Sequence, residues 1–208
     1  MKTELHCIER GNDLFPESLL HQDGGFSQIY AIGNIGLLNL PLLGFFCSTR
    51  CPGDVILRTY DIAKELRKDM TAVISGFHTP VERDCLDILL KGRQPVVISP
   101  ARGITDMRIP MILKKPLEDG RLLILSPFEG KERRMNATLA ERRNRFVALI
   151  ARNILIAYAA PGSRTEQLGL DLLQQGKNLY LLDHQSNNHL IQKGGCLISR
   201  TIRGQIYF

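Results

Sequence analysis

Three turns of the sequence place hydroxyl, glycine and guanidinium groups where an anion could bind. The first is Ser48-Thr49-Arg50, which follows an apolar run and is followed in turn by Gly53 and a helical pattern. Hydroxyls, a guanidinium and the N–H groups of a helix N-terminus together form a cradle for phosphate. A turn with an N-capping hydroxyl explains the same residues equally well when this segment is taken alone.

Two later turns repeat the combination. Ser75-Gly76 follows a second apolar run, and its glycine permits close approach of the backbone to a ligand. Gly162-Ser163-Arg164 opens a helical segment, so that a phosphate could bind at the helix N-terminus. The simpler interpretations are an ordinary turn and an ordinary capped helix. Neither turn completes a dinucleotide fingerprint or a P-loop.

A strongly basic segment lies between residues 131 and 152. It contains seven basic residues against Glu132 and Glu141, namely Lys131, Arg133, Arg134, Arg142, Arg143, Arg145 and Arg152. On a helix, Arg142, Arg145 and Arg152 would fall near one stripe, with Phe146, Leu149 and Ile150 on the buried side. The segment indicates either a nucleic-acid-binding surface or a solvated charged face, which is the commoner reason for such a run.

The elements that would position these turns alternate between strand and helix. Short apolar runs predict strands at 42–47, 72–74, 95–98, 122–125, 154–158, 179–182 and 196–198, and helical periods predict helices at 54–68, 81–91 and 165–175. Near-continuous apolar strands are typical of a parallel sheet covered by helices. The prediction is a doubly wound α/β fold of the Rossmann type. Its core is residues 42–208, preceded by an irregular lead-in, residues 1–41, with one short strand at 28–32.

Bulk composition limits the classes of protein. The chain has 208 residues, a net charge of +6 and twice as many arginines as lysines, 18 against 9, which favours a phosphate-bearing partner. We expect no membrane span and no secretory signal, hence a cytoplasmic protein. The five scattered cysteines predict reduced thiols and no metal site, with Cys47 and Cys51 as a weak pair. We expect no cofactor.

Read in order, several segments resemble the DNA-processing protein A (DprA, also called Smf) family. Arg143-Asn144-Arg145 matches its R-N-R element unchanged, and Ser48-Thr49-Arg50 is similar to its G-S-R turn. The other similar segments are Phe15-Pro16-Glu17-Ser18-Leu19, Ile29 to Asn34, Val73-Ile74-Ser75-Gly76, Gly120 to Pro127, Gly162-Ser163-Arg164-Thr165 and Leu190 to Gly195. The resemblance covers residues 15–198.

The resemblance implies an extended Rossmann fold, a homodimer and a binding protein rather than an enzyme. It implies that single-stranded DNA binds in a basic pocket and is delivered to a RecA-type recombinase, in DNA uptake, natural transformation or recombination. The site residues that it predicts, together with the turns above, are Ser48, Thr49, Arg50, Gly53, Ser75, Gly76, Arg93, Arg143, Asn144, Arg145, Gly162, Ser163 and Arg164. No catalytic residue is assigned.

Departures from the family pattern leave two alternatives open. The family's G-I-D and A-H are replaced by Thr79-Pro80-Val81-Glu82 and Asp84-Cys85, which changes the turn after Gly76. Residues 161–166 are loosely similar to the P-G-G-x-G-T-x-x-E motif of LOG-type phosphoribohydrolases. That likeness implies a carboxylate that assists N-glycosidic cleavage and an arginine that holds phosphate. A nucleotide-binding sensor without catalysis is the third interpretation.

Overall fold

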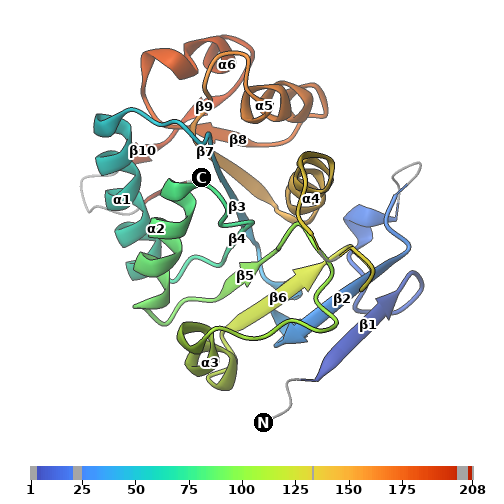
Figure 1. Cartoon of the computed structure of the whole chain (residues 1–208). Helices are drawn as coiled ribbons and strands as arrows, with labels where there is room; N and C mark the ends of the chain where they lie inside the picture. The colour runs from blue at the N-terminus through green and yellow to red at the C-terminus, as the bar shows by residue number, and fades with distance from the viewer. Residues whose placement is uncertain (1–3, 21–24, 133, 201–205, 208) are drawn as a thin grey trace.

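The computed structural model describes residues 4–20, 25–132, 134–200 and 206–207, and its centre is one large sheet (Figure 1). Within these residues nine strands pair in the order β1-β2-β6-β5-β4-β3-β7-β8-β9. Their bounds are β1 Leu5–Glu9, β2 Gln28–Gly33, β3 Leu43–Cys47, β4 Val73–Ser75, β5 Val96–Ile98, β6 Leu122–Ser126, β7 Asn153–Tyr158, β8 Leu179–Leu181 and β9 Cys196–Leu197. Neighbours from β6 to β9 run parallel, whereas β1 and β2 are antiparallel additions.

Helices cover both faces of the sheet, which confirms the predicted doubly wound α/β class. They are α1 Gly53–Lys68, α2 Pro80–Leu90, α3 Met111–Glu118, α4 Ala137–Ile150, α5 Arg164–Gln174 and α6 Asn188–Gln192. Buried side chains of α1, α2 and α3 share one core cluster, and those of α4, α5 and α6 share the other. None of the described helices is long and apolar enough to cross a membrane. Short 3-10 helices occur at Glu17–Leu19 (η1), Ile35–Asn39 (η2) and Gln185–Asn187 (η3), and β10 Ser199–Arg200 pairs with β11 Ile206–Tyr207.

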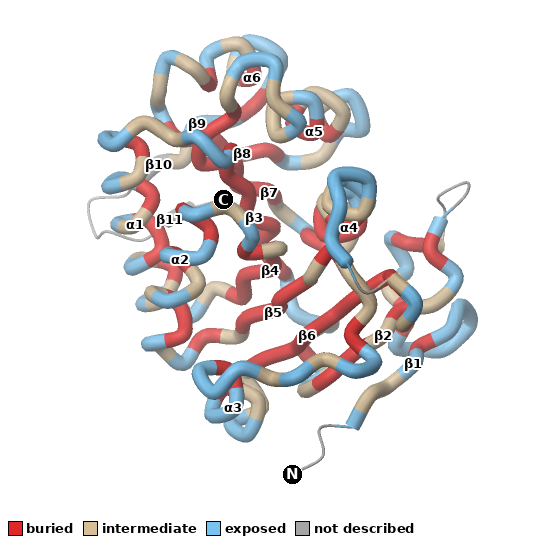
Figure 2. The backbone as a smooth tube through the Cα atoms, viewed as in Figure 1, coloured by how far each residue is buried: buried red, intermediate tan, exposed pale blue. Residues whose placement is uncertain are grey.

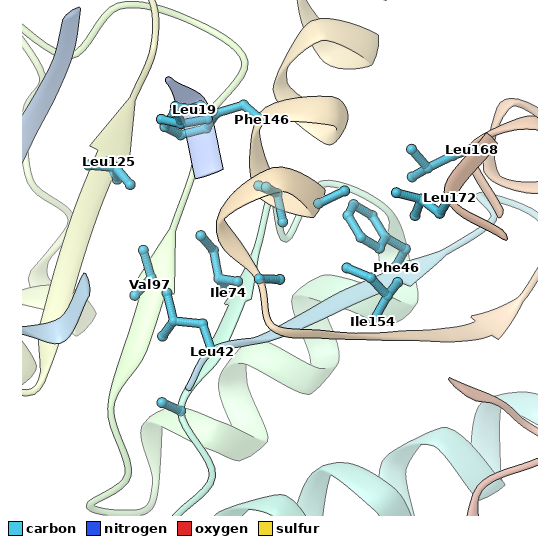
Figure 3. Packing of buried hydrophobic residues seen from close by; sticks show 14 of the residues in the cluster. Leu19, Leu42, Phe46, Ile74, Val97, Leu125, Phe146, Ile154, Leu168 and Leu172 are labelled. Atoms are coloured by element: carbon cyan, nitrogen blue, oxygen red, sulfur yellow. The ribbon is translucent and has the colours of Figure 1, made fainter. Parts of the chain in front are cut away.

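The central strands are apolar throughout because both of their faces are covered. All five residues of β3 and all five of β6 are buried, and Figure 2 shows the burial concentrated in the sheet. On one face Phe46 of β3 and Ile154 of β7 pack with Leu168 and Leu172 of α5 (Figure 3). Burial on both faces explains why apolar runs located these strands to within one or two residues.

The helix boundaries follow local capping. The Thr79 side chain accepts the Glu82 N–H while the Glu82 side chain accepts the Thr79 N–H, a capping box that begins α2. Gly176 has φ +71° and follows the cap residue of α5, as glycines commonly do at helix C-termini. The predicted basic stripe is wrong at Arg152, because Ala151 is extended and α4 ends at Ile150. Arg133 of the same basic segment lies outside the described residues.

The N-terminal segment is more regular than predicted. Besides β2 it contains β1, and β2 pairs with β6 through Tyr30 and Ser126. Phe15, Leu19 and Phe26 are buried in the core cluster of α4. The prediction of an irregular lead-in with one strand was therefore wrong, because Ile8 is the one buried residue of β1 and no apolar alternation marks that strand. The division at residue 41 stays a prediction.

Candidate nucleic-acid interface

The order of strands along the chain reverses direction between β3 and β7. From β3 the chain runs outward through β4, β5 and β6, then returns to place β7 on the other side of β3 (Figure 1). Such a reversal separates the connections that leave the two neighbouring strands, and open α/β sheets bind ligands there, beyond the carboxyl ends. The turns after β3 and β7 therefore form the first candidate site.

The structure brings these two predicted turns into contact. The Ser48 and Ser163 hydroxyl oxygens lie 3.2 Å apart, and the Ala160 N–H donates to Ser48 Oγ at 2.9 Å. Ser163 Oγ also accepts the Glu166 N–H at 3.2 Å, which caps α5. Two hydroxyls and the N-terminal end of a helix thus converge from segments more than a hundred residues apart in sequence.

The N-terminus of α1 lies next to the first turn and has a different character. Its cap residue, Pro52, supplies no side-chain acceptor, so the first N–H groups of the helix lack the cap that Ser163 gives α5. Thr49, Arg50 and Gly53 are exposed. Among the described residues no hydrogen bond or ion pair engages Arg50. An uncapped helix N-terminus and an exposed guanidinium are groups of the kind that bind anions in proteins, so anion binding by Arg50 stays a prediction.

A buried carboxylate ties the first two turns together. Glu82 of α2 is 5 % exposed, and its Oε1 accepts the Cys47 N–H at 3.0 Å. Its Oε2 accepts the N–H groups of His78 at 2.8 Å and Thr79 at 3.2 Å. Glu82 therefore fixes the end of β3 relative to the turn that follows β4. In the sequence, Glu82 stands only as part of a departure from the family pattern, and nothing in the sequence indicated that its carboxylate would bind three backbone N–H groups.

Arg143 lies inside the site rather than on its surface. The residue is 4 % exposed, and its Nη1 donates to the Ser99 carbonyl at 2.8 Å while its Nε donates to Asn144 Oδ1 at 2.8 Å. A Cβ at Gly76 would lie 1.3 Å from Nη1, so the guanidinium occupies the space that this glycine leaves. Burial lowers the Arg143 pKa from its usual value, and the negative charge of Glu82 partly offsets that shift. A direct phosphate contact by Arg143 stays a prediction, and its burial favours a positioning role.

The turn after β4 has an unusual backbone. Phe77 has φ +46°, in the left-handed region that non-glycine residues rarely adopt, and its N–H donates to Ser75 Oγ at 3.1 Å. Ser75 also accepts the Ser99 N–H through its carbonyl at 2.8 Å. Ser75 is fully buried and is thus part of the support of the turn, with its hydroxyl turned to the backbone.

The remaining predicted residues fall in two places. Arg145 and Arg164 are exposed near the α4–α5 boundary, where Arg164 Nη1 donates to the Ala137 carbonyl at 3.3 Å and Arg145 pairs loosely with Glu141 at 3.5 Å. Arg93 precedes β5 and so lies at the amino ends of the parallel strands, away from the other candidates. The structure therefore does not bring Arg93 into the candidate site.

Sequence reasoning missed two buried residues that shape this edge. Asn187 Nδ2 donates to the carbonyls of Ala157 and Leu182 at 3.2 and 2.9 Å, and its Oδ1 accepts the Ala159 N–H at 3.1 Å. Ser99 receives Arg143 through its carbonyl. Neither residue carried a sequence signal, because an asparagine and a serine in polar turns are ordinary. In the described residues no group of histidine, cysteine and carboxylate side chains is arranged to hold a metal ion.

Three thiols lie under the first turn, and they are expected to differ in reactivity. A hydrogen bond from the Cys47 thiol lowers the pKa of the half-buried Cys51 below its usual value, whereas burial raises the pKa of Cys85. The Cys51 thiolate should therefore form at lower pH, and its alkylation by iodoacetamide should begin at lower pH than that of Cys85. Peptide mass spectrometry after timed labelling measures both rates.

The matched controls for this prediction change only the donor. Cys47→Ser keeps a hydroxyl donor and should retain part of the effect, while Cys47→Ala should return the pH dependence of Cys51 labelling toward that of an ordinary thiol. Identical profiles in the three proteins would show that the hydrogen bond does not activate Cys51.

The sequence of this chain matches a known protein family. A family model described as DNA recombination-mediator protein A matches residues 6–203. The chain belongs to the DNA recombination-mediator protein A family. This confirms the resemblance to DNA-processing protein A that the ordered motifs indicated. Among curated proteins, none matches the sequence.

Solved structures show the same fold as this member of the DNA recombination-mediator protein A family. The DNA processing protein A of Streptococcus pneumoniae has a TM-score of 0.80 at 18% identity, with 99% of this chain and 75% of that chain covered. The Helicobacter pylori protein, described by its single-stranded DNA binding mode, has a TM-score of 0.75 at 20% identity, covering 94% and 90%. A molybdenum cofactor binding protein from Rippkaea orientalis reaches 0.55 at 12% identity, covering 76% and 89%.

Proposed function

We propose that this protein binds single-stranded DNA at the carboxyl edge of its sheet and protects the strand before delivering it to a recombinase. The observation that carries the proposal is the joining of the Ser48 and Ser163 turns beside the uncapped N-terminus of α1 and the exposed Arg50. Membership of the family and the fold shared with the Helicobacter pylori protein support the same ligand.

The groups present favour binding to the sugar-phosphate backbone over reading of bases. Hydroxyls, helix N-termini and guanidinium groups bind phosphate oxygens, which are the same in every sequence. Aromatic residues make up 6% of the chain and tryptophan is absent from it, so stacking platforms are scarce. Charge should therefore dominate the affinity.

The experiment that tests this proposal is a titration of oligo-dT and of a mixed-sequence oligomer by filter binding at several salt concentrations. Both oligomers should bind with similar affinity, and the logarithm of the binding constant should fall linearly with the logarithm of salt, by about 0.7 per phosphate contacted. Double-stranded DNA of the same length is the control for strand preference. A flat salt dependence, or no binding at low salt, would overturn the proposal.

We extend the proposal to the setting that the family resemblance implies. The protein would act as a cytoplasmic homodimer, pass its strand to a RecA-type recombinase, and serve DNA uptake, natural transformation or recombination. Its role would be that of a binding protein, without a cofactor and without catalysis. Co-sedimentation of the protein with a recombinase on oligo-dT, and its mass in solution, test these two associations separately.

The phosphoribohydrolase alternative receives less support from the geometry. Glu166 would be the carboxylate of that motif, yet its Oε2 accepts the Gly162 N–H at 2.6 Å and its Oε1 pairs with His189 at 2.8 Å. A carboxylate engaged on both oxygens is poorly placed to assist glycosidic cleavage. Release of free base from AMP by the purified protein would favour this alternative. Tight AMP binding without release of base would favour the nucleotide-sensor alternative.

A further inference from the structure

A second recess lies outside the carboxyl edge, between α4 and α5. It measures about 420 Å³, and its floor is made by Ala148, Leu149, Leu168 and Leu172. Figure 3 shows Leu168 and Leu172 projecting from α5 toward the centre of the domain, where they form part of the core. The other lining residues are Gly25, Phe26, Arg142, Arg145, Asp171 and Gln175. The recess, called the α4–α5 cleft below, thus combines an apolar floor with a polar rim.

Arg142 on the rim of the cleft is positioned by two aromatic rings and not by an ion pair with a carboxylate. Its guanidinium carbon lies 5.4 Å from the centre of the Phe26 ring and 5.7 Å from that of Phe128. Phe26 is itself fixed by an edge contact with Phe146, whose ring centre lies 5.0 Å away. Across the described ranges Arg142 has no hydrogen bond or ion pair, although its side chain is exposed. The two rings therefore hold the Arg142 guanidinium in one position, and its N–H groups remain able to donate hydrogen bonds to an incoming anion.

The α4–α5 cleft adjoins a second hollow that extends to Arg164, the chain neighbour of Ser163. A smaller hollow of about 120 Å³ is lined by Asn144, Arg145 and Arg164, among others, and it shares Arg145, Leu168 and Asp171 with the cleft. Arg164 follows Ser163, which touches Ser48 at the edge of the sheet. A surface path thus leads from the edge past Arg164 and Arg145 to Arg142.

The two acidic residues along this path are already engaged. Glu141 pairs with Arg145 at 3.5 Å, and Asp171 Oδ1 accepts a hydrogen bond from Gln167 Nε2 at 2.8 Å. The arginines outnumber them, so the path favours a ligand that carries negative charge. The leucines that line the recess are largely buried, and together with Ala148 they offer an apolar surface against which a flat group could pack. A nucleotide supplies both features in one unit, a base with apolar faces and a phosphate.

We propose that the α4–α5 cleft is a nucleotide subsite that receives one base of the bound single strand while Arg142 holds the adjacent phosphate. The inference rests on the proposed function, because the strand reaches the cleft from the carboxyl edge. The strand leaves the edge at Arg164, passes Arg145 and ends its contact at Arg142. Oligomers that span only the edge do not engage the subsite.

The test compares a short oligo-dT of about 4 nucleotides with a long one of about 15, using wild type, Arg142→Ala and a control. Arg142→Ala should weaken binding of the long oligomer about five- to tenfold and leave the short one unchanged, because one charge-assisted contact is lost. Arg142→Lys should recover part of the loss, since it keeps the charge without the planar fork. Arg152→Ala is the matched control, because Arg152 is an exposed arginine that follows the C-terminal end of α4 and does not line the cleft.

A second measurement tests the seating of a base. A second long oligomer carries abasic sugars in the half that would reach the α4–α5 cleft, with each half tested in turn. Wild type should bind the abasic strand more weakly than the intact strand. In Arg142→Ala the affinities for the two strands should be nearly equal. Equal affinity of wild type for the intact and the abasic strand would overturn the base subsite. Urea unfolding should show each variant folded, and Arg142→Ala should lose no more than about 1 kcal/mol, the contribution of an exposed cation–π contact.

The outcomes separate this inference from the proposed function. If Arg50→Ala weakens both oligomers while Arg142→Ala changes neither, the edge binds DNA and the cleft inference fails. If Arg142→Ala instead dissociates a dimer without changing long-oligomer affinity, the cleft is a protein interface and the inference also fails. If wild type binds neither oligomer, the proposed function fails and the subsite with it.

Discussion

Replacing Glu82 with alanine is expected to lower the free energy of unfolding by about 3–5 kcal/mol. Three backbone N–H groups, those of Cys47, His78 and Thr79, would lose their acceptor at once, at about 1–3 kcal/mol for each group that stays buried. The buried guanidinium of Arg143 would also lose the negative charge of Glu82, which partly offsets the cost of its burial. Urea unfolding followed by circular dichroism measures the change.

Two further variants make the Glu82 prediction specific. Glu82→Gln keeps one carbonyl oxygen, but its amide N–H₂ group would face backbone N–H donors. Its free energy of unfolding should therefore fall by most of the amount expected for Glu82→Ala. Asp87→Ala removes an exposed carboxylate from the same helix and should change stability by less than about 0.5 kcal/mol. Similar unfolding midpoints for Glu82→Ala and Asp87→Ala would contradict the role assigned to Glu82.

Replacing Arg50 with alanine is expected to weaken binding of oligo-dT by about 1.5–3 kcal/mol while the fold stays intact. Arg50 is exposed beside the uncapped N-terminus of α1, so guanidinium and backbone N–H groups can bind one phosphate together. The slope of the logarithm of the binding constant against the logarithm of salt should drop by about 0.7. Titration with labelled oligomer at two salt concentrations measures both changes.

The controls for Arg50 use other basic side chains. Arg50→Lys should recover part of the affinity, because an ammonium keeps the charge but not the bidentate fork. Arg93→Ala removes an equally exposed arginine at the amino ends of the strands and should leave affinity unchanged. Equal affinities for wild type and a well-folded Arg50→Ala would refute the proposed contact even if the protein binds DNA.

The parallel part of the sheet was predictable because burial on both faces leaves a continuous apolar run, as in β3 and β6. Helix α3 was not expected, since Pro110 and Pro116 obscure its period although the helix forms around them. Strand β1 was not predicted because it forms through pairing with β2, and the local sequence of β1 has no alternating apolar pattern.

The candidate site was predictable in its turns but not in its interior. Hydroxyls and arginines after strands located the edge where Ser48 meets Ser163, because strand ends gather on one side of a parallel sheet. An arginine on a helix gives no sign of whether it points outward, so the burial of Arg143 against Ser99 could not be foreseen. The role of Glu82 depends on three backbone donors, which no side-chain pattern records.

The pairing of β2 with β6 imposes an order on how the newly made polypeptide can assemble. Tyr30 leaves the ribosome first, yet its partner Ser126 follows about a hundred residues later, after β3, β4 and β5 have been made. Until then the apolar side chains of Phe15, Leu19 and Phe26 have no α4 to cover them. The segment that contains β2, although made before the central strands, should thus be among the last to become protected from amide hydrogen exchange, and chaperones have a long opportunity to bind there.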